Sequence, residues 1–202
     1  ILLVTGGNNA GSFLELLGNG RDFGLEHLNY TYQENPGGIA EALGLARNFV
    51  GDEKCVVHLG DNILLGSLEH EVAAFERQER GGRILLKVVE NPESYGVACF
   101  DEGGALTDLV EKPSDPPSSL AVIGVYFYDS QVWSMIDNLV PSGRGELEIT
   151  DVNNAYLRQA ELSYGLITGE WLDAGESHES YRRANEAVLK YDLFPQLNGG
   201  AR

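Results

Sequence analysis

The first half of the chain alternates between two hydrophobic periods, and this alternation restricts the fold more than any other feature of the sequence. Strand-like apolar patterns cover residues 1–5, 28–33, 54–62 and 83–90. The segments between them, 10–17, 39–49 and 68–80, carry apolar residues at helical spacing. Strands that alternate with helices usually form a parallel sheet with helices on its faces. We therefore predict an α/β fold with three layers, α/β/α, around a mostly parallel, Rossmann-like sheet.

The second half contains more strand patterns. Residues 95–113 predict two strands joined by a hairpin loop at 101–104, where two glycines follow two acidic residues. Further strand patterns occupy 121–129, 162–167 and 170–175, and helical patterns occupy 131–139, 148–159 and 177–191. We therefore predict a strand-rich second half that continues the sheet.

The length of 202 residues suits one domain with a substantial core. We predict a single domain over residues 1–191 and a frayed tail over 192–202. Ile1 opens directly on an apolar strand pattern, whereas chain termini are normally solvated and loosely held. We therefore expect that further sequence precedes Ile1 and that the domain is incomplete at its N-terminus.

The charge of the chain excludes some classes of partner. With 31 acidic and 14 basic residues, the formal net charge is −17. Binding of nucleic acid depends on Lys and Arg that neutralise phosphates, so we expect no nucleic-acid partner. No apolar stretch approaches the roughly 20 residues that span a bilayer, and we expect no membrane partner either. A small phosphorylated substrate would also be repelled unless a local cation intervened.

Two aspartates follow apolar segments that read as strands. Asp61 ends the stretch VVHLGD, and Asp173 follows Trp171 and Leu172. In open α/β sheets, ligands bind beyond the carboxyl ends of the strands. Mg²⁺ uses one or two protein carboxylates together with substrate phosphates, so this pair could hold it and supply the missing positive charge. The alternative is that each aspartate only caps a turn, which spacing alone favours.

Two further features could likewise be either part of a binding site or ordinary surface structure. Lys112 ends a strand pattern and is followed by Pro113, so its ammonium has a definite direction and suits a phosphate; it could equally form a surface pair with Glu111. The loop 35–38 precedes a helix, where backbone N–H groups could meet a phosphate or a base. It could also be a plain turn between strand and helix.

Seven stretches in a fixed order resemble a known family. They are YQENPGGIAEA, LGDN, SYGVACF, LVEKP, AVIGVYFYD, RGELEITDVNNAYL and WLDAG. Together they resemble the sugar-1-phosphate nucleotidyltransferases, and among these the glucose-1-phosphate thymidylyltransferases. The resemblance extends over the chain to about Tyr191.

The resemblance implies an Mg²⁺-dependent cytoplasmic enzyme from a bacterium or an archaeon, which commonly forms homo-oligomers. Its substrates would be a nucleoside triphosphate, dTTP, and a sugar 1-phosphate, glucose 1-phosphate. Its products would be dTDP-glucose and pyrophosphate. The nucleotide-diphospho-sugar transferase fold of the family would bind the sugar in its strand-rich half.

Roles transfer only to positions that match the motifs of the family. The nucleotide would be bound by Gln33, Pro36, Gly38 and Asp61. The metal would be held by Asp61 and Asp173, which with Lys112 form the catalytic set. The sugar phosphate would be bound by Tyr95, Gly96, Glu111, Lys112 and Val122. The Gln33 amide can pair with a pyrimidine edge, which leaves both dTTP and UTP open.

One departure from the family leaves alternatives open. The family begins with a strand, a glycine-rich loop that carries an arginine and a Pro-Lys segment, and these 202 residues do not contain them. We expect transfer to require that segment, so that the 202-residue chain alone has little or no activity. The alternative is a non-catalytic sugar-nucleotide-binding or regulatory module of the same fold. A metal-dependent glycosyltransferase is a further rival, against which LVEKP and WLDAG argue.

Overall fold

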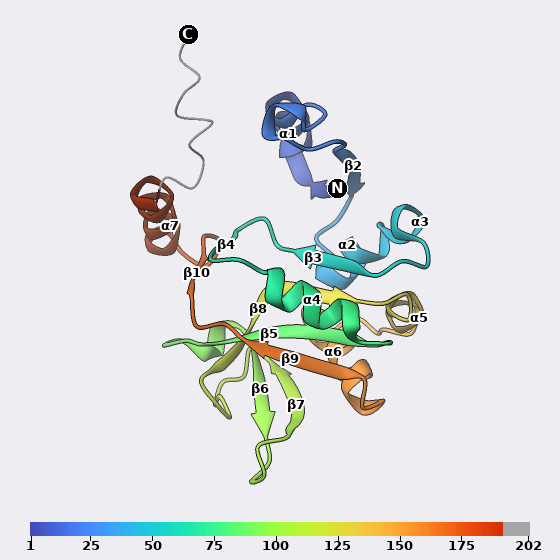
Figure 1. Ribbon diagram of the computed structural model, residues 1–202, viewed down its shortest axis with the longest axis vertical. Helices are drawn as coiled ribbons and strands as arrows, with labels where there is room; N and C mark the ends of the chain where they lie inside the picture. Colours follow the sequence, from blue (N-terminus) through green and yellow to red (C-terminus); the bar gives the residue numbers. More distant parts are fainter. Residues whose placement is uncertain (192–202) are drawn as a thin grey trace.

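The computed structural model describes residues 1–191 (Figure 1). The predicted tail, 192–202, lies outside the described residues. The strands are β1 Leu2–Gly6, β2 Asn29–Gln33, β3 Cys55–His58, β4 Asn62–Leu65, β5 Gly82–Val88, β6 Gly96–Phe100, β7 Leu106–Glu111, β8 Leu120–Tyr128, β9 Leu162–Leu166 and β10 Glu170–Asp173. The α-helices are α1 Ala10–Leu17, α2 Ile39–Gly44, α3 Arg47–Val50, α4 Glu69–Arg77, α5 Val132–Asp137, α6 Ile149–Arg158 and α7 His178–Tyr191. Single 3₁₀ turns are η1 Gly7–Asn9, η2 Arg21–Phe23 and η3 Pro92–Ser94.

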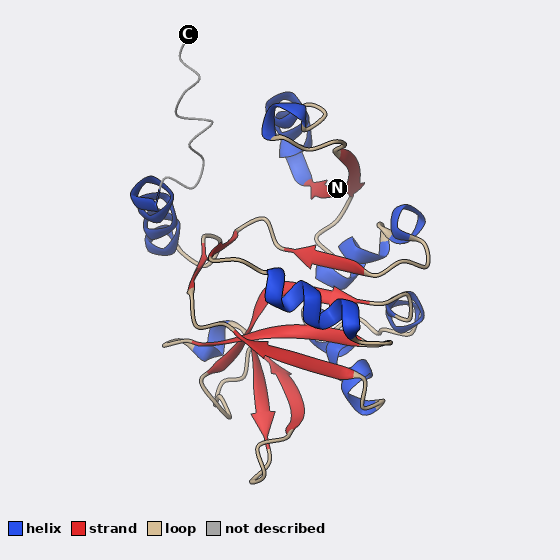
Figure 2. Ribbon diagram, viewed as in Figure 1, coloured by secondary structure: helices blue, strands red, loops and turns tan. Residues whose placement is uncertain are grey.

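The largest sheet has six strands and is built around β8 (Figure 2). Its path runs β7-β6-β8-β5-β9, and β3 pairs with the end of β8 beyond β6. Strand β8 is apolar along its length because both of its faces are covered, and all but its first residue are buried. The hairpin predicted at 101–104 is confirmed as the β6–β7 connection.

The prediction of a mostly parallel sheet is wrong. In the six-stranded sheet only the β5–β9 pairing is parallel, and β8 runs antiparallel to β3, β5 and β6. Strands β3 and β5 do share one direction, as the alternation of strands and helices requires. They are not neighbours, however, because β8 from the second half of the chain lies between them. The sheet is therefore mixed.

Helices cover both faces of this sheet, in agreement with three layers. Side chains alternate along a strand, so neighbouring residues of β5 and β8 enter different core clusters. Leu85 and Phe127 pack with Phe75 of α4 on one face. On the other face the cluster contains residues of α2, α5 and α6: Ala40, Leu43, Val132, Trp133, Met135, Ile136, Ile149, Val152 and Tyr156. With the labels of Figure 1, which has the same view, α4 crosses the near face in Figure 2, α6 lies behind the strands, and α5 lies at the right-hand edge.

Two smaller sheets complete the described structure. Strands β1 and β2 pair in parallel and lie apart from the six-stranded sheet in Figure 1. Strand β4 pairs antiparallel with β10, although more than a hundred residues separate them in the sequence. The helix predicted over 39–49 is broken into α2 and α3. Among residues 1–191, no helix combines the length and apolar character that crossing a membrane requires.

Candidate active site

A cavity of about 530 Å³ lies against the middle of β8, where Val122, Gly124 and Tyr126 line it. The residues that line it come from separate parts of the chain: the start of α2, the β3–β4 connection, the β6–β7 hairpin with the residues just before β6, strand β8, the loop before α6 with the first turn of that helix, and β10 with the loop after it. All residues predicted to bind the metal or the sugar phosphate line this cavity: Asp61, Tyr95, Gly96, Glu111, Lys112, Val122 and Asp173. The fold thus brings together positions that are distant in sequence.

The pairing of β4 with β10 brings the two aspartates together. Asp173 lies opposite Asn62 in the register, and the N–H of Ala174 donates to the carbonyl oxygen of Asp61 at 2.8 Å. Gly175 lies between the two carboxylates, because a Cβ at this position would collide with Asp61 Oδ2 and lie 3.4 Å from Asp173 Oδ1. Both carboxylates therefore face the same small space.

This arrangement raises the pKa of one of the two carboxyl groups. Burial is the largest cause that raises the pKa of Asp173, and the charges of Asp61 and Glu176 raise it further. The hydrogen bond that Asp173 Oδ1 accepts from the N–H of Gly175, at 2.8 Å, acts in the opposite direction. Two ionised carboxylates that face the same space destabilise each other unless a cation lies between them.

The donor set suits Mg²⁺. Among residues 1–191, no group of three or more His, Cys, Asp or Glu side chains forms a metal cluster. Mg²⁺ does not need one, since it keeps several waters and takes one or two carboxylates plus substrate phosphates. The paired carboxylates of Asp61 and Asp173, open to the cavity, provide such a half-shell.

Asn62 fixes the position of Asp61, and the sequence interpretation did not assign it a role. Its side chain is buried, donates from Nδ2 to Asp61 Oδ1 at 2.9 Å, and accepts at Oδ1 from Trp171 Nε1 at 2.7 Å and from the N–H of Gly124 at 2.9 Å. Gly124 is required here, because a Cβ would lie 2.7 Å from Asn62 Oδ1. Three strands therefore hold the amide that orients Asp61.

Lys112 enters the cavity from an uncommon backbone conformation. Its φ is +43°, in the left-handed region that L-residues seldom adopt. Its N–H donates to the carbonyl oxygen of Tyr95 at 2.9 Å, which continues the β6–β7 ladder by one residue. The exposed side chain forms no ion pair with another residue of the described chain. Its ammonium is therefore available to an anion in the cavity.

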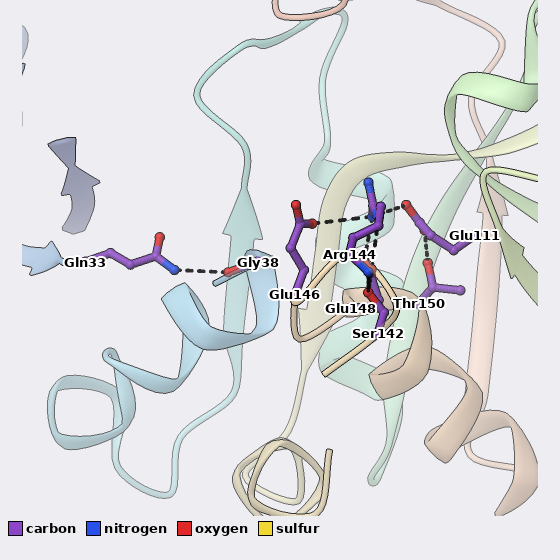
Figure 3. A network of polar contacts seen from close by, with 8 residues as sticks. All are labelled: Gln33, Gly38, Glu111, Ser142, Arg144, Glu146, Glu148 and Thr150. Carbon is purple, nitrogen blue, oxygen red and sulfur yellow. Dashed lines mark hydrogen bonds and ion pairs between the residues drawn. The ribbon is translucent and has the colours of Figure 1, made fainter. Parts of the chain in front are cut away.

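Glu111 is held by a network on the other wall (Figure 3). Its Oε2 accepts from Thr150 Oγ1 at 2.5 Å, and its Oε1 lies 3.3 Å from the Arg144 guanidinium. Arg144 also contacts Glu146 at 3.4 Å and Glu148 at 2.8 Å. Burial alone would raise the pKa of Glu148, but the hydrogen bonds from Ser142 and Arg144 outweigh it and lower the pKa. One arginine thus neutralises part of a strongly acidic wall.

Tyr95 links the cavity wall to the loop after β10. Its hydroxyl donates to Glu176 Oε2 at 2.8 Å, and its ring meets the Trp171 ring edge to face with centroids 5.4 Å apart. Burial, followed by the bond to Glu176, raises the pKa of Tyr95, so the phenol stays a neutral donor. Glu176 also accepts from Asn91 and Ser94. The loop after β10 is thereby tied to the start of β6.

The predicted nucleotide-binding residues Gln33, Pro36 and Gly38 do not line this cavity. Gln33 Nε2 donates to Glu41 Oε2 at 2.6 Å and to the carbonyl oxygen of Gly38 at 3.2 Å, the latter drawn in Figure 3. Gly38 has a φ of +97°, and Ile39, next in the chain, lines the cavity. The predicted nucleotide loop therefore lies beside the cavity rather than in it.

Comparison with known proteins places the chain in a family. Residues 1–191 match the family model described as Nucleotidyl transferase. The chain belongs to this family. Among curated relatives, glucose-1-phosphate thymidylyltransferase of Neisseria meningitidis is 38% identical over 98% of this chain and 69% of its own length. The low-salt glycan biosynthesis nucleotidyltransferase Agl11 of Haloferax volcanii is 43% identical over 87% of this chain and 49% of its own length.

Solved structures agree with the assignment to the nucleotidyl transferase family. A Bacillus anthracis protein assigned as a glucose-1-phosphate thymidylyltransferase, in complex with sucrose, is 45% identical with a TM-score of 0.86, and covers 93% of this chain and 75% of that chain. A UDP-glucose pyrophosphorylase complexed with UDP-glucose shares the fold, with a TM-score of 0.80 at 23% identity. The chain spans between about half and 70% of the two curated relatives described above.

Several cavity residues of this nucleotidyl transferase were missed in the sequence interpretation. They are Asn62, Arg144, Glu146, Glu148, Thr150, Trp171 and Glu176. All but Glu176 lie inside stretches that carried the resemblance, namely LGDN, RGELEITDVNNAYL and WLDAG. The signal was therefore present, but it did not show which side chains would face a ligand.

Proposed function

We propose that this chain forms the sugar-phosphate- and metal-binding part of a glucose-1-phosphate thymidylyltransferase. The reaction transfers dTMP from dTTP to glucose 1-phosphate and gives dTDP-glucose and pyrophosphate. The observation that carries the proposal is one cavity that gathers Asp61, Asp173, Glu111 and Lys112. Relatives at 38% identity that bear this enzyme name support the choice of substrates.

The sugar end of the cavity suits a hydroxylated ring. Glu111 lines the cavity and is positioned by Thr150 and Arg144, and its carboxylate would accept hydrogen bonds from sugar hydroxyls. Gly96 lets Thr150 and Glu111 approach the strand, because a Cβ here would lie 3.0 Å from Thr150 Oγ1 and 3.3 Å from Glu111 Oε2. Lys112 would bind the sugar phosphate as a point charge, and Val122 and Tyr95 would bound the ring.

The chemistry needs positioning and charge neutralisation rather than a covalent intermediate. A phosphate oxygen of the sugar attacks the α-phosphorus of the nucleotide in line, the new P–O bond forms, and pyrophosphate leaves. Asp61 and Asp173 would hold Mg²⁺, which when bound offsets the negative charge of the phosphates. Lys112 would hold the attacking phosphate in place, and Asn62 would keep Asp61 oriented.

The base would be read beside the cavity. The Nε2 of Gln33 donates hydrogen bonds to Glu41 and to the carbonyl oxygen of Gly38, so the Oε1 of Gln33 is the side-chain atom that could contact a base. A carbonyl oxygen accepts from the N3–H of thymine or uracil, whereas the N3 of cytosine is itself an acceptor. This supports dTTP or UTP as the donor. Homo-oligomerisation and a cytoplasmic location stay predictions.

Turnover measured on the protein encoded by the complete reading frame tests the proposal. We expect Mg²⁺-dependent formation of dTDP-glucose and pyrophosphate, and chromatography would measure both products. Lys112→Gln should lower kcat/KM by about 10²- to 10³-fold because the sugar phosphate loses its counter-charge. Lys190→Gln, on the exposed C-terminal helix α7, is the matched control and should leave turnover unchanged.

The same assay separates the alternative. A complete protein that binds dTDP-glucose but forms none would be the non-catalytic module considered above. The 202-residue chain, assayed beside it, should show little turnover, and a rate near that of the complete protein would contradict this expectation.

A further inference from the structure

A second cavity of about 250 Å³ lies behind one wall of the first. Tyr95, Trp171, Asp173 and Glu176 line both cavities, so a single layer of side chains separates them. The proposed transferase reaction uses none of the remaining lining, which is made by the end of β5, the segment after it and the first turns of α7: Lys87, Val88, Val89, Glu90, Asn91, Leu172, Ser180 and Arg183.

Apart from the wall that they share, the two cavities are lined by strand residues on different faces of the six-stranded sheet. Lys87 alternates with Leu86 along β5 and shares a face with Leu85, which belongs to the core cluster under α4. Val122 and Tyr126, which line the first cavity, belong to the cluster on the opposite face. A ligand in the second cavity would therefore not occupy the sugar-phosphate site.

Two cations, Lys87 and Arg183, line the second cavity, and the nearby acidic residue Glu179 has its pKa lowered by the hydrogen bond from Arg182 and further by the charges of Arg182 and Arg183. Within residues 1–191, none of the ion pairs includes Lys87 or Arg183. The neighbouring Arg182 differs, since it pairs with Glu179 and Glu186 on the outer face of α7. In a chain of net charge −17, acidic partners are abundant. Two unpaired cations at one cavity therefore favour binding of an anion from solution.

The acidic residues of this lining restrict which anion fits. Glu176 is held by Asn91, Ser94 and Tyr95, and Asp173 turns toward Asp61 and Gly175. Carboxylates repel a bare anion but accept hydrogen bonds from hydroxyl groups. The volume lies just below the roughly 300–1,000 Å³ of pockets for drug-sized ligands. A single sugar ring with one phosphate combines the required charge, hydroxyls and size.

We propose that the second cavity binds a hydroxylated phosphate of the size of a hexose phosphate, with the phosphate on Lys87 and Arg183 and the hydroxyls on Glu90 and Glu176. The binding does not depend on the transferase reaction. Binding would nevertheless affect the wall of the first cavity, because a ligand that contacts Glu176 competes with the hydrogen bond that Glu176 accepts from the Tyr95 hydroxyl.

Calorimetric titration with glucose 6-phosphate tests the proposal. We expect Lys87→Gln and Arg183→Gln each to weaken binding by about tenfold or more, because each removes a hydrogen bond between charged groups. Arg182→Gln is the matched control: it lies on the same helix, next in sequence, but outside the cavity, and it should leave the affinity unchanged. Thermal unfolding of each variant verifies that the fold is retained.

The control variant Lys112→Gln distinguishes the two cavities. Binding kept in Lys112→Gln and lost in the Lys87→Gln, Arg183→Gln double variant supports the second site. The reverse pattern would place the ligand in the first cavity and overturn the proposal, as would the absence of binding at millimolar concentration. Inorganic phosphate that binds as tightly as glucose 6-phosphate would refute the role of the hydroxyls. Failure of the transferase assay would leave these outcomes unaffected.

Discussion

Lys112 combines a proposed functional side chain with a strained backbone. Its left-handed conformation costs an L-residue roughly 1–2 kcal/mol, and the Pro113 that follows restricts it further. Strain of this kind persists where the surroundings determine the backbone, here through the bond from Lys112 N–H to Tyr95. A glycine would adopt the same conformation without the penalty.

We therefore predict that Lys112→Gly is more stable than Lys112→Ala by about 1 kcal/mol, since both lose the side chain but only the alanine keeps the strain. Urea denaturation of the two variants measures the difference. Equal midpoints would show that the backbone at this position is not strained.

The carboxylates of Asp61 and Asp173 repel each other when both are ionised, and this repulsion destabilises the folded state. Because the pKa of Asp173 is raised in the fold, the folded state binds its proton more tightly than the unfolded state does. The stabilisation from this group is present below the ordinary aspartate pKa of about 3.9 and is lost as pH rises through the higher folded pKa. At neutral pH the ionised pair therefore destabilises the protein.

We predict that Asp173→Asn raises Tm at pH 7 in the presence of a chelator and that this gain shrinks as pH falls toward about 4. Added Mg²⁺ should raise the Tm of the wild type and not that of Asp173→Asn. Asp52→Asn, an exposed aspartate before β3, should respond to Mg²⁺ like the wild type. If the Tm of Asp173→Asn at pH 7 were lower than that of the wild type, repulsion between the two carboxylates would not destabilise the fold.

At the scale of elements, the loop before α2 is fixed by the loop before α6. The N–H of Leu147 donates to the carbonyl oxygen of Gly37 at 2.7 Å, and the N–H of Ala40 donates to that of Leu147 at 3.2 Å. Between these bonds, Gly38 approaches so closely that a Cβ would lie 2.5 Å from the Leu147 carbonyl oxygen. The predicted nucleotide loop and the acidic wall around Arg144 are therefore one unit.

Gly38→Ala should lower the free energy of unfolding by more than about 2 kcal/mol, because it combines a φ of +97° with a backbone collision. Gly143→Ala, in the neighbouring loop, meets no atom within 4 Å and is the control expected to have little effect. Denaturant titration of both compares them directly. Similar stabilities for the two would mean that the loops are not joined as described.

The local sequence pattern predicted where the strands and helices lie better than it predicted which strands would be neighbours in the sheet. Apolar alternation located β5, β8 and the β6–β7 hairpin, because these depend on residues close in sequence. The position of β8 between β3 and β5 depends on packing across the whole chain, which no short pattern contains. For the same reason Asp61 and Asp173 could be selected by their position after strand patterns, whereas Asn62 and Arg144 acquire their contacts only in the folded site.

At the scale of the whole molecule, β8 joins the two halves of the chain. It pairs with β3 and β5 from the first half and with β6 from the second. A fragment ending at residue 119 would lack the strand between β3 and β5 and should show no cooperative thermal unfolding by circular dichroism. A sharp transition in that fragment would show that the first half closes its core without β8.

Strand β8 also determines when the centre of the six-stranded sheet can form. During synthesis, β3 and β5 are translated before residues 120–128, so the edges that pair with β8 have no partner until that strand has been made. Such edges are templates for association with other chains. Conditions that slow translation between β5 and β8 should therefore increase aggregation of nascent protein without altering the finished fold.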